Sequence, residues 1–247
     1  MSQQAGEESL EIERKYEVAP DVPLPSAATF ERAGYAASSP VTYELSAVYF
    51  DTARGDLARR GLALRVRHGG KDAGWHIKVR GEEGVREFFW PPSAEMPEGA
   101  RAELRDRIGG AAGDVAPIAE LETERTVVTL SDAAGAELVE IADDRVTAFD
   151  RSAGVARVWR EWEAELLPGA LPEALDDVEP LLLSAGAAQS LSLAKIARAT
   201  GNLVTLARAR GAEPERIAAL EALDRSDRAA AVEAGVIAGE SVNRGER

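Results

Sequence analysis

The sequence predicts an α+β protein in which antiparallel strands come first and helices follow. From about residue 10 to residue 165, apolar and polar residues alternate in short runs separated by Gly, Pro, Asp and Ser, which is typical of antiparallel strands. After Pro168 the chain is rich in Ala and Leu at helical spacing. We expect strands at 10–18, 43–50, 62–68, 74–80, 84–90, 121–130, 136–142 and 157–166, and helices at 25–34, 96–108, 171–185, 190–200 and 213–235.

The length of the chain indicates one principal domain with a small appendage. At 247 residues and 45% hydrophobic content, it can bury one sizeable core. Residues 1–8 are polar and show no periodicity, so we expect a disordered N-terminus. We place the main domain at 9–203. Residues 204–247 are expected to form a helical or flexible C-terminal tail, in which the helix at 213–235 follows a linker at 210–214 and is loosely attached.

The composition excludes several classes of site and partner. The chain has no cysteine, so disulfides and thiol nucleophiles are excluded and a cytoplasmic location is expected. A formal net charge of -14 argues against nucleic-acid binding through a basic surface. No apolar run approaches the roughly 18 residues of a membrane span, so no membrane partner is expected. Because there are only two histidines, the chemistry must rest on carboxylates, lysines and arginines.

Four of the predicted strands have one charged face and one apolar face. Because side chains alternate across a strand, the acidic faces consist of Glu11, Glu13, Lys15 and Glu17 on the first strand and of Glu161, Glu163 and Glu165 on the last. Two intervening strands have basic faces, which consist of Arg65 and Arg67 and of His76, Lys78 and Arg80. Each face alone could be a solvated surface. Here the sign of the charge is segregated by strand, and if the sheet closes, the carboxylates can face a wall of cations.

Such a cavity suits a metal ion together with a polyanionic phosphate. Mg²⁺ and Mn²⁺ take carboxylate and phosphate oxygens together, so paired glutamates supply the protein part of the coordination. Arginines hold phosphate oxygens through two parallel N–H groups, and lysines act as point charges. Hydrolysis then requires a metal-positioned water and no covalent nucleophile.

A series of short motifs follows in order along the chain. It consists of Glu11-x-Glu13-x-Lys15, VYFDT at 48–52, LRVR at 64–67, HIKVR at 76–80, Arg86, Arg125, Glu140-x-Ala142-x-Asp144, EWEAE at 161–165 and Lys195. Over about residues 10–200 this series resembles the CYTH superfamily, also called triphosphate tunnel metalloenzymes. The stretch at 45–67 is most similar to the bacterial inorganic triphosphatase branch. The resemblance implies an eight-stranded antiparallel β-barrel, the triphosphate tunnel, with helices packed on its outside.

The same resemblance implies roles for individual residues. The metal ligands would be Glu11, Glu13, Asp144, Glu161 and Glu163, with Mg²⁺ or Mn²⁺ as the cofactor. The substrate-binding cations would be Lys15, Arg65, Arg67, Lys78, Arg80, Arg86, Arg125 and Lys195. Lys15, Glu13 and Glu163 are the expected catalytic residues. For Lys195 the alternative is a solvated lysine on a helix.

Three functions from different classes remain open on the sequence alone. The first is metal-dependent hydrolysis of a triphosphate, an acid anhydride, with inorganic triphosphate (tripolyphosphate) as the preferred substrate. The second acts on an organic triphosphate, as the class IV adenylate cyclases and thiamine triphosphatases of this superfamily do. The third is a non-catalytic module for polyphosphate or a nucleotide, although retention of both glutamate pairs argues against it. The expected partner is therefore a small-molecule triphosphate or polyphosphate, and a homodimer is left open.

Overall fold

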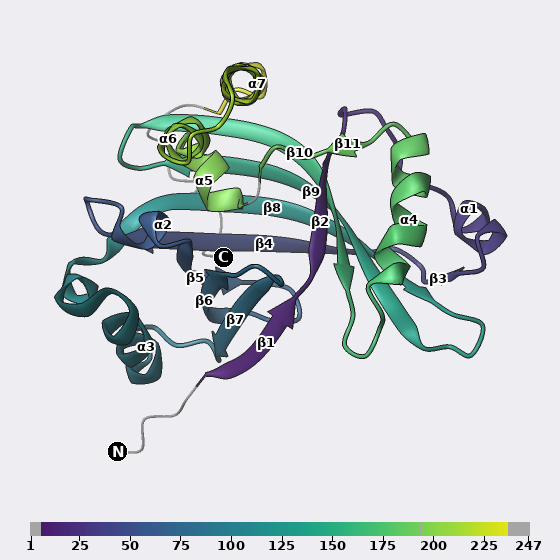
Figure 1. The fold of residues 1–247 in the computed structure, drawn as a ribbon, viewed down its shortest axis with the longest axis horizontal. Coiled ribbons are helices and arrows are strands. Elements are labelled where there is room, and N and C mark those ends of the chain that lie inside the picture. The colour runs from purple at the N-terminus through teal and green to yellow at the C-terminus, as the bar shows by residue number, and fades with distance from the viewer. Residues whose placement is uncertain (1–5, 193, 237–247) are drawn as a thin grey trace, which may run out of the picture.

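The computed structural model describes residues 6–192 and 194–236, and one antiparallel β-sheet lies at its centre (Figure 1). The described residues form eleven strands in the order β1-β7-β6-β5-β4-β8-β9-β10-β2-β11, with β3 paired to β8. The strands are β1 (Glu7–Glu11), β2 (Glu13–Glu17), β3 (Ala36–Ala37), β4 (Val41–Asp51), β5 (Leu62–His68), β6 (Gly74–Arg80), β7 (Val85–Trp90), β8 (Ala116–Ser131), β9 (Glu137–Asp150), β10 (Val155–Leu166) and β11 (Ala188–Gln189).

The helices lie between and after these strands. They are α1 (Ala27–Arg32), α2 (Asp56–Arg59), α3 (Glu98–Ile108), the 3-10 helix η1 (Gly109–Asp114), α4 (Glu173–Ser184), α5 (Lys195–Ala199), α6 (Leu203–Ala209) and α7 (Pro214–Glu233). Strands and helices in this proportion confirm the predicted α+β class. None of the described helices is long and apolar enough to cross a lipid bilayer.

The N-terminal stretch supplies strands near both ends of the sheet order, because β1 is the first strand of that order and β2 is the last but one. β1 pairs with β7, whereas β2 pairs with β10, and only Ile12 separates β1 from β2. At this junction the carbonyl oxygen of Ile12 accepts a hydrogen bond from the amide of Leu166 at 2.8 Å. The two halves of one extended segment therefore hold together strands that are far apart in the sheet order (Figure 1).

The expected closed barrel of eight strands is wrong in this form. In the described residues the sheet has eleven strands, and no hydrogen-bonded ladder closes it. The strand expected at 10–18 is divided at Ile12 because its two halves pair with different neighbours. The two-residue strands β3 and β11 add to the count. β1 also begins at Glu7, so the segment expected to be disordered, 1–8, overlaps a strand, and residues 1–5 lie outside the described residues.

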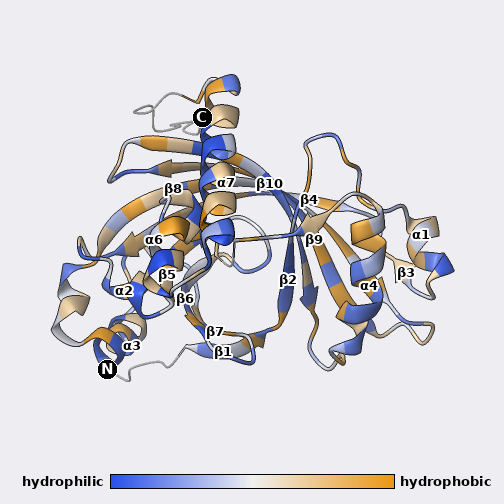
Figure 2. Cartoon of the chain, turned by 45° about the horizontal axis from the view of Figure 1, so that its top comes forward, coloured by the Kyte–Doolittle hydropathy of each residue, from blue (hydrophilic) through white to orange (hydrophobic). Residues whose placement is uncertain are grey.

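Helices cover the outer face of the sheet at two places, as the apolar faces of the strands require. Val178 and Leu182 of α4 pack against the fully buried Trp162 of β10. Leu104 of α3 packs against Ile77 of β6 in a second cluster. α4 carries both hydrophobic and hydrophilic residues along its length (Figure 2). Each of these buried apolar side chains contributes roughly 1.5–3 kcal/mol to the stability of the fold.

The C-terminal helices are attached more firmly than the sequence suggested. α7 packs along β10 and buries Leu220 and Ala231. Asp224 of α7 forms an ion pair with Arg157 of β10 at 2.7 Å. Asp227 forms a bidentate pair with Arg198 of α5, at 2.7 and 2.9 Å. A loosely attached tail is therefore wrong for the part of 204–247 that the structure describes, whereas 237–247 lies outside the described residues.

We predict that deleting residues 211–247 strongly destabilises the domain. The deletion takes Asp224 from Arg157 and Asp227 from Arg198, which keeps Glu17, and it removes the buried side chains of Leu220 and Ala231. Loss of one partner of a buried ion pair alone costs about 3–5 kcal/mol. For a chain of this size the melting temperature should fall by about 10 °C or more. The measurement is thermal unfolding followed by circular dichroism.

A surface variant of the same helix is the control. Glu221→Gln breaks only the exposed ion pair with Arg208, so we expect a change within about 0.5 kcal/mol. A truncated protein that melts at the temperature of the full chain would contradict the observed packing of α7.

Candidate active site

The charged faces of the strands meet in one cavity of about 1080 Å³. Ten of the residues that the sequence singled out line it, and they come from six strands and one helix: Glu11, Glu13, Lys15, Arg65, Arg67, Lys78, Arg80, Arg125, Glu163 and Lys195. β2, which supplies two of them, is hydrophilic over most of its length (Figure 2). The strict alternation of each strand explains this convergence, because one face of the strand is apolar and packs outward.

Three carboxylates form a compact acidic cluster at one wall of this cavity, and of the three only Glu163 is among the residues that line the cavity. Asp144 of β9 and Glu161 and Glu163 of β10 are all buried, and each offers an oxygen within 4.8 Å of the others. The β9–β10 ladder places Asp144 directly opposite Glu161. Lys195, the first residue of α5, inserts its ammonium group among them, at 2.9 Å from Asp144, 2.6 Å from Glu161 and 2.5 Å from Glu163. Lys195 is therefore not a solvated lysine.

Two further cations neutralise the acidic cluster. Arg125 of β8 donates to both oxygens of Asp144, at 2.7 and 2.6 Å, and to Glu163 at 2.6 Å. Lys15 of β2 contacts Glu163 and also lies 3.0 Å from Glu13. Asp144 and Glu163 are thus held by charge-assisted hydrogen bonds, and Glu161 Oε1 by its ion contact with Lys195.

The ionisation of the acidic cluster follows from this balance. Burial acts to raise the pKa of Asp144, but Arg125 and Lys195 outweigh it and hold that pKa below its usual value. Burial likewise opposes ionisation of Glu163, and the surrounding cations hold its pKa well below the usual range. Burial acts to lower the pKa of Lys195, but the three carboxylates raise it well above the ordinary value. All these groups therefore carry their charges at neutral pH.

The acidic cluster fits a hard divalent cation. It offers only carboxylate oxygens, which are the ligands that Mg²⁺ and Mn²⁺ prefer. Glu161 Oε2 is fixed by the indole N–H of Trp159 at 2.9 Å, which leaves Oε1 turned toward the other carboxylates. In the described residues Oε1 is a buried oxygen without a hydrogen-bond partner, and its contact with Lys195 lacks hydrogen-bond geometry.

The other two expected metal ligands lie outside this cluster. Glu11 pairs with Lys78 at 2.5 Å, and Glu13 pairs with Lys15. The register of β2 and β10 explains the separation, because Lys15 and not Glu13 stands opposite Glu163. The structure therefore brings Asp144, Glu161 and Glu163 together, while Glu11 and Glu13 face the same cavity from a different position.

Two arginines of β5 present unused donors to the cavity. The Nε atoms of Arg65 and Arg67 are buried and have no hydrogen-bond partner among the described residues. Arg65 donates to the hydroxyl of Tyr49 at 3.3 Å. Burial, together with Arg65 and Arg125, lowers the pKa of Arg67 to about 9. Burial and the neighbouring cations at this wall therefore oppose the charge of Arg67.

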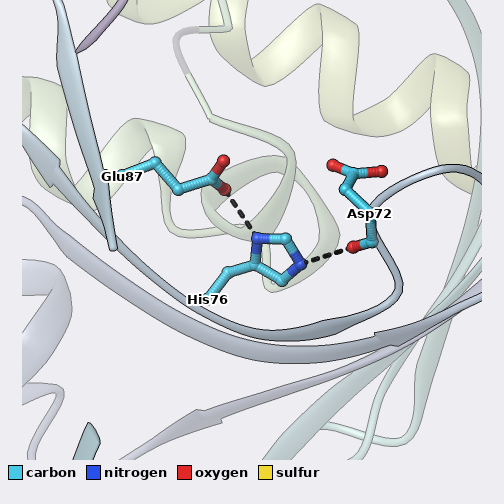
Figure 3. Close-up of side chains that lie close together, drawn as sticks. All are labelled: Asp72, His76 and Glu87. Atoms are coloured by element: carbon cyan, nitrogen blue, oxygen red, sulfur yellow. Dashed lines mark hydrogen bonds and ion pairs between the residues drawn. The ribbon is translucent and has the colours of Figure 1, made fainter. Parts of the chain in front are cut away.

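A second group of polar side chains consists of Asp72, His76 and Glu87 (Figure 3). The fully buried ring of His76 contacts Glu87 through Nδ1 at 2.8 Å and the carbonyl oxygen of Asp72 through Nε2 at 2.9 Å. The side chain of Asp72 forms an ion pair with Arg67. Glu87 in turn lies 3.6 Å from Arg65. His76 thus connects the turn before β6, which carries Asp72, to Glu87, which faces Arg65.

The protonation of His76 is a compromise between two demands. Both of its ring nitrogens face acceptor oxygens, which requires a proton on each. Burial opposes the charge and lowers the pKa of His76 to about 4. Burial acts to raise the pKa of Glu87, but His76, Lys78 and Arg65 outweigh it and hold that pKa well below its usual value. The three side chains lie near enough to surround a metal ion, but both nitrogens are occupied and the carboxylates face arginines, so this group is better suited to orienting cations.

The structure places the side chain of Arg86 outside the cavity and that of its neighbour Glu87, which the sequence analysis did not name, inside it. Arg86 faces away from the cavity, with 66% of its side chain exposed and an ion pair to Glu8. Glu87, one position later on β7, faces the cavity and stands opposite Lys78. Since successive side chains point to opposite faces, an error of one position reverses the direction of the side chain. Its position across from Lys78 was the signal that could have identified Glu87.

Comparisons with known proteins agree with this geometry. The family model of the CYTH domain matches residues 9–199. Uncharacterised proteins from two strains of Mycobacterium tuberculosis are each 37% identical over 207 residues, which is 78% of this chain and 40% of the relative. The chain thus spans well under half of the length of these relatives.

Two solved structures match most of this chain. A proposed adenylate cyclase from Bacillus halodurans has 19% identity and a TM-score of 0.51, covering 77% of this chain and 97% of that one. A proposed adenylyl cyclase from Hippeastrum, described as having a dominant triphosphatase activity, has 19% identity and a TM-score of 0.46, covering 84% and 99%. The match of the family model over most of the chain decides the assignment: this protein belongs to the CYTH domain family.

Proposed function

We propose that this domain is a metal-dependent triphosphatase that hydrolyses inorganic triphosphate in the charged cavity. The observation that carries this proposal is one cavity lined both by carboxylates and by cations. The acidic cluster is at one wall, and the unused donors of Arg65 and Arg67 are at another. Because the substrate is a polyanion and the cofactor a cation, each finds a complementary wall.

Binding would exchange the partners of the buried charges. Mg²⁺ or Mn²⁺ held by Asp144, Glu161 and Glu163 would neutralise phosphate oxygens and orient the attacking water. Lys195 and Arg125, which now neutralise those carboxylates, would be freed to contact the phosphate chain. The metal ion and the phosphate chain would thus each replace partners that the buried charges now have within the protein.

The remaining residues divide into those that would bind the phosphate chain and those that would act on the reacting phosphoryl group. Arg65, Arg67 and Lys78 would hold the phosphate chain, since their donors face the cavity. Arg80 lines the same cavity and would extend this grip. We assign Lys15 to the reacting phosphoryl group because it lies against Glu163 of the acidic cluster. The proposed catalytic residues remain Lys15, Glu13 and Glu163.

A triphosphate ester is the second candidate substrate, and one observation favours it. The cavity wall formed by the C-terminal helices includes the apolar residues Ile196, Leu203 and Leu206 beside the cations Arg210 and Arg216. Such a wall can pack against the organic group of ATP or thiamine triphosphate. An adenylate cyclase reaction belongs to this second candidate. A cytoplasmic location, consistent with a chain that lacks cysteine, remains part of the proposal.

The substrate is tested by phosphate release from tripolyphosphate, ATP, thiamine triphosphate and long-chain polyphosphate, with Mg²⁺ and with Mn²⁺, while cyclic AMP is monitored. We expect tripolyphosphate to have the highest kcat/KM, and activity to disappear with EDTA and return with either metal. Full turnover in metal-free protein would exclude the mechanism. Preference for an organic triphosphate would replace the substrate but keep the site, and binding without turnover of any substrate would reduce the domain to a polyphosphate-binding module.

We predict that Glu163→Gln abolishes most of the activity while the protein stays folded. The substitution keeps size and removes one negative charge from the acidic cluster. Loss of a residue that only supports a metal ligand already costs about 10–100-fold, so we expect a fall in kcat of roughly 100-fold or more. The measurement is the initial rate of phosphate release at increasing Mn²⁺.

Glu140→Gln is the matched control for this variant. Glu140 also lines the cavity, but its ion-pair partner is the exposed Lys71, at 3.4 Å. We expect its kinetics to stay close to those of the unaltered protein. Equal and small effects of both substitutions would remove the acidic cluster from the mechanism.

The carboxylate of Asp72 forms an ion pair with Arg67 and would compete with an anionic substrate for it. We expect Asp72→Asn to lower KM for tripolyphosphate, because the substrate no longer competes with a protein carboxylate. For an ion pair with one exposed partner, worth about 0.2–1 kcal/mol, the change is about 1.5- to 5-fold.

A double-mutant cycle separates this effect from general changes in charge. Arg67→Ala should raise KM, and in that background Asp72→Asn should have little effect, because the residue it competes for is absent. A KM that falls equally in both backgrounds would show that Asp72 acts through long-range charge and not through Arg67.

A further inference from the structure

Beyond the CYTH match at 9–199, the helix α7 carries a carboxylate that reaches toward the acidic cluster. Asp227 is 3% exposed, although it lies on a helix that otherwise presents many charged residues to solvent. Both of its oxygens accept hydrogen bonds from the guanidinium of Arg198, at 2.7 and 2.9 Å. A bidentate pair of this kind fixes the plane of the guanidinium as well as its position.

Arg198 connects α7 to the carboxylate side of the cavity. Its NH1 donates to both oxygens of Glu17, at 3.0 and 2.9 Å, and lies 3.6 Å from Glu161 Oε2. Its guanidinium also lies over the ring of Trp159, 4.9 Å from the ring centre. Trp159 is the residue whose N–H binds Glu161 Oε2. Arg198 therefore contacts both Glu161 and Trp159, the residue that holds Glu161 Oε2.

The same arginine also fixes the helix that carries Lys195. Arg198 follows Lys195 by three residues on α5, which has only five residues and little stability of its own. The pair with Asp227 supplies an anchor for this short helix from outside the sheet. The position of the Lys195 ammonium group in the acidic cluster thus depends on a residue of α7.

We propose that Asp227 is a positioning residue for the acidic cluster: through Arg198 it orients Glu161, so that Glu161 Oε1 faces a bound metal ion. This inference rests on the proposed function for the identity of the ion, but its test needs no turnover. Without Asp227, Arg198 is free to shift toward Glu17 and Glu161 and to compete with a cation for their oxygens. One negative charge near the site is lost as well, so both effects weaken metal binding.

The test is a titration of the full chain with Mn²⁺, followed by the electron paramagnetic resonance signal of the free ion, for Asp227→Asn and for Asp224→Asn. Asp224 is the matched control because it lies on the same helix and pairs with Arg157, which donates to the carbonyl oxygen of Ala199 and touches none of the three carboxylates. We expect both variants to melt at lower temperature. Only Asp227→Asn should raise the Kd for Mn²⁺, by about 10-fold, as is usual for a residue that orients a metal ligand.

The outcomes separate this inference from the proposed function. If the two variants lose thermal stability but bind Mn²⁺ equally well, Asp227 is a structural anchor only and the inference is wrong. If Asp227→Asn does not fold, Arg198→Lys, which keeps the charge but loses the bidentate pair, should show the same rise in Kd. Mn²⁺ binding by the unaltered protein without hydrolysis of any triphosphate would remove the proposed function and leave the role of Asp227 intact, whereas no Mn²⁺ binding would overturn the inference.

Discussion

The structure depends on one electrostatic constraint: each charge buried in the cavity needs an opposite charge nearby. An isolated buried charge costs far more than a fold of marginal stability can tolerate. Asp144, Glu161 and Glu163 meet this constraint through Lys195 and the cations around it. Under the same constraint, the proposed function has a metal ion replace these cations at the carboxylates. The cations can then pair with the anionic substrate. The cavity can be charged and stable because the carboxylates and cations of the protein neutralise one another.

This constraint also explains why the outer parts of the molecule matter to the site. The cluster is held by side chains from β2, β8, β9, β10 and α5, so its geometry depends on the register of several strands and the position of one short helix. Two aspartates of α7 anchor arginines of β10 and α5 from the other side. Because ion pairs at this depth are strong only when geometry is good, firm packing around the cavity is a condition for its charge balance.

Much of the fold and the site could be predicted from the sequence because the strand period of two is visible in it. Alternation placed Arg65, Arg67, Lys78 and Glu163 on faces that the structure brings into one cavity. Because of the same period of two, the side chain of Arg86 points away from the cavity while that of Glu87 beside it points into it. What the sequence does not contain is the choice of partner across long separations. The division of the first strand at Ile12, the pairing of Lys15 opposite Glu163, and the contact between Asp227 and Arg198 all depend on tertiary packing.

The exchange of partners is the central claim, and it is tested most directly by diffraction from crystals of the protein soaked in Mn²⁺ with a non-hydrolysable triphosphate. Anomalous scattering locates the manganese independently of any assumption about ligands. We expect a peak bounded by Asp144, Glu161 and Glu163, with the Lys195 ammonium group moved from these carboxylates to the phosphate chain. Manganese bound elsewhere, with Lys195 still in contact with all three carboxylates, would contradict the account.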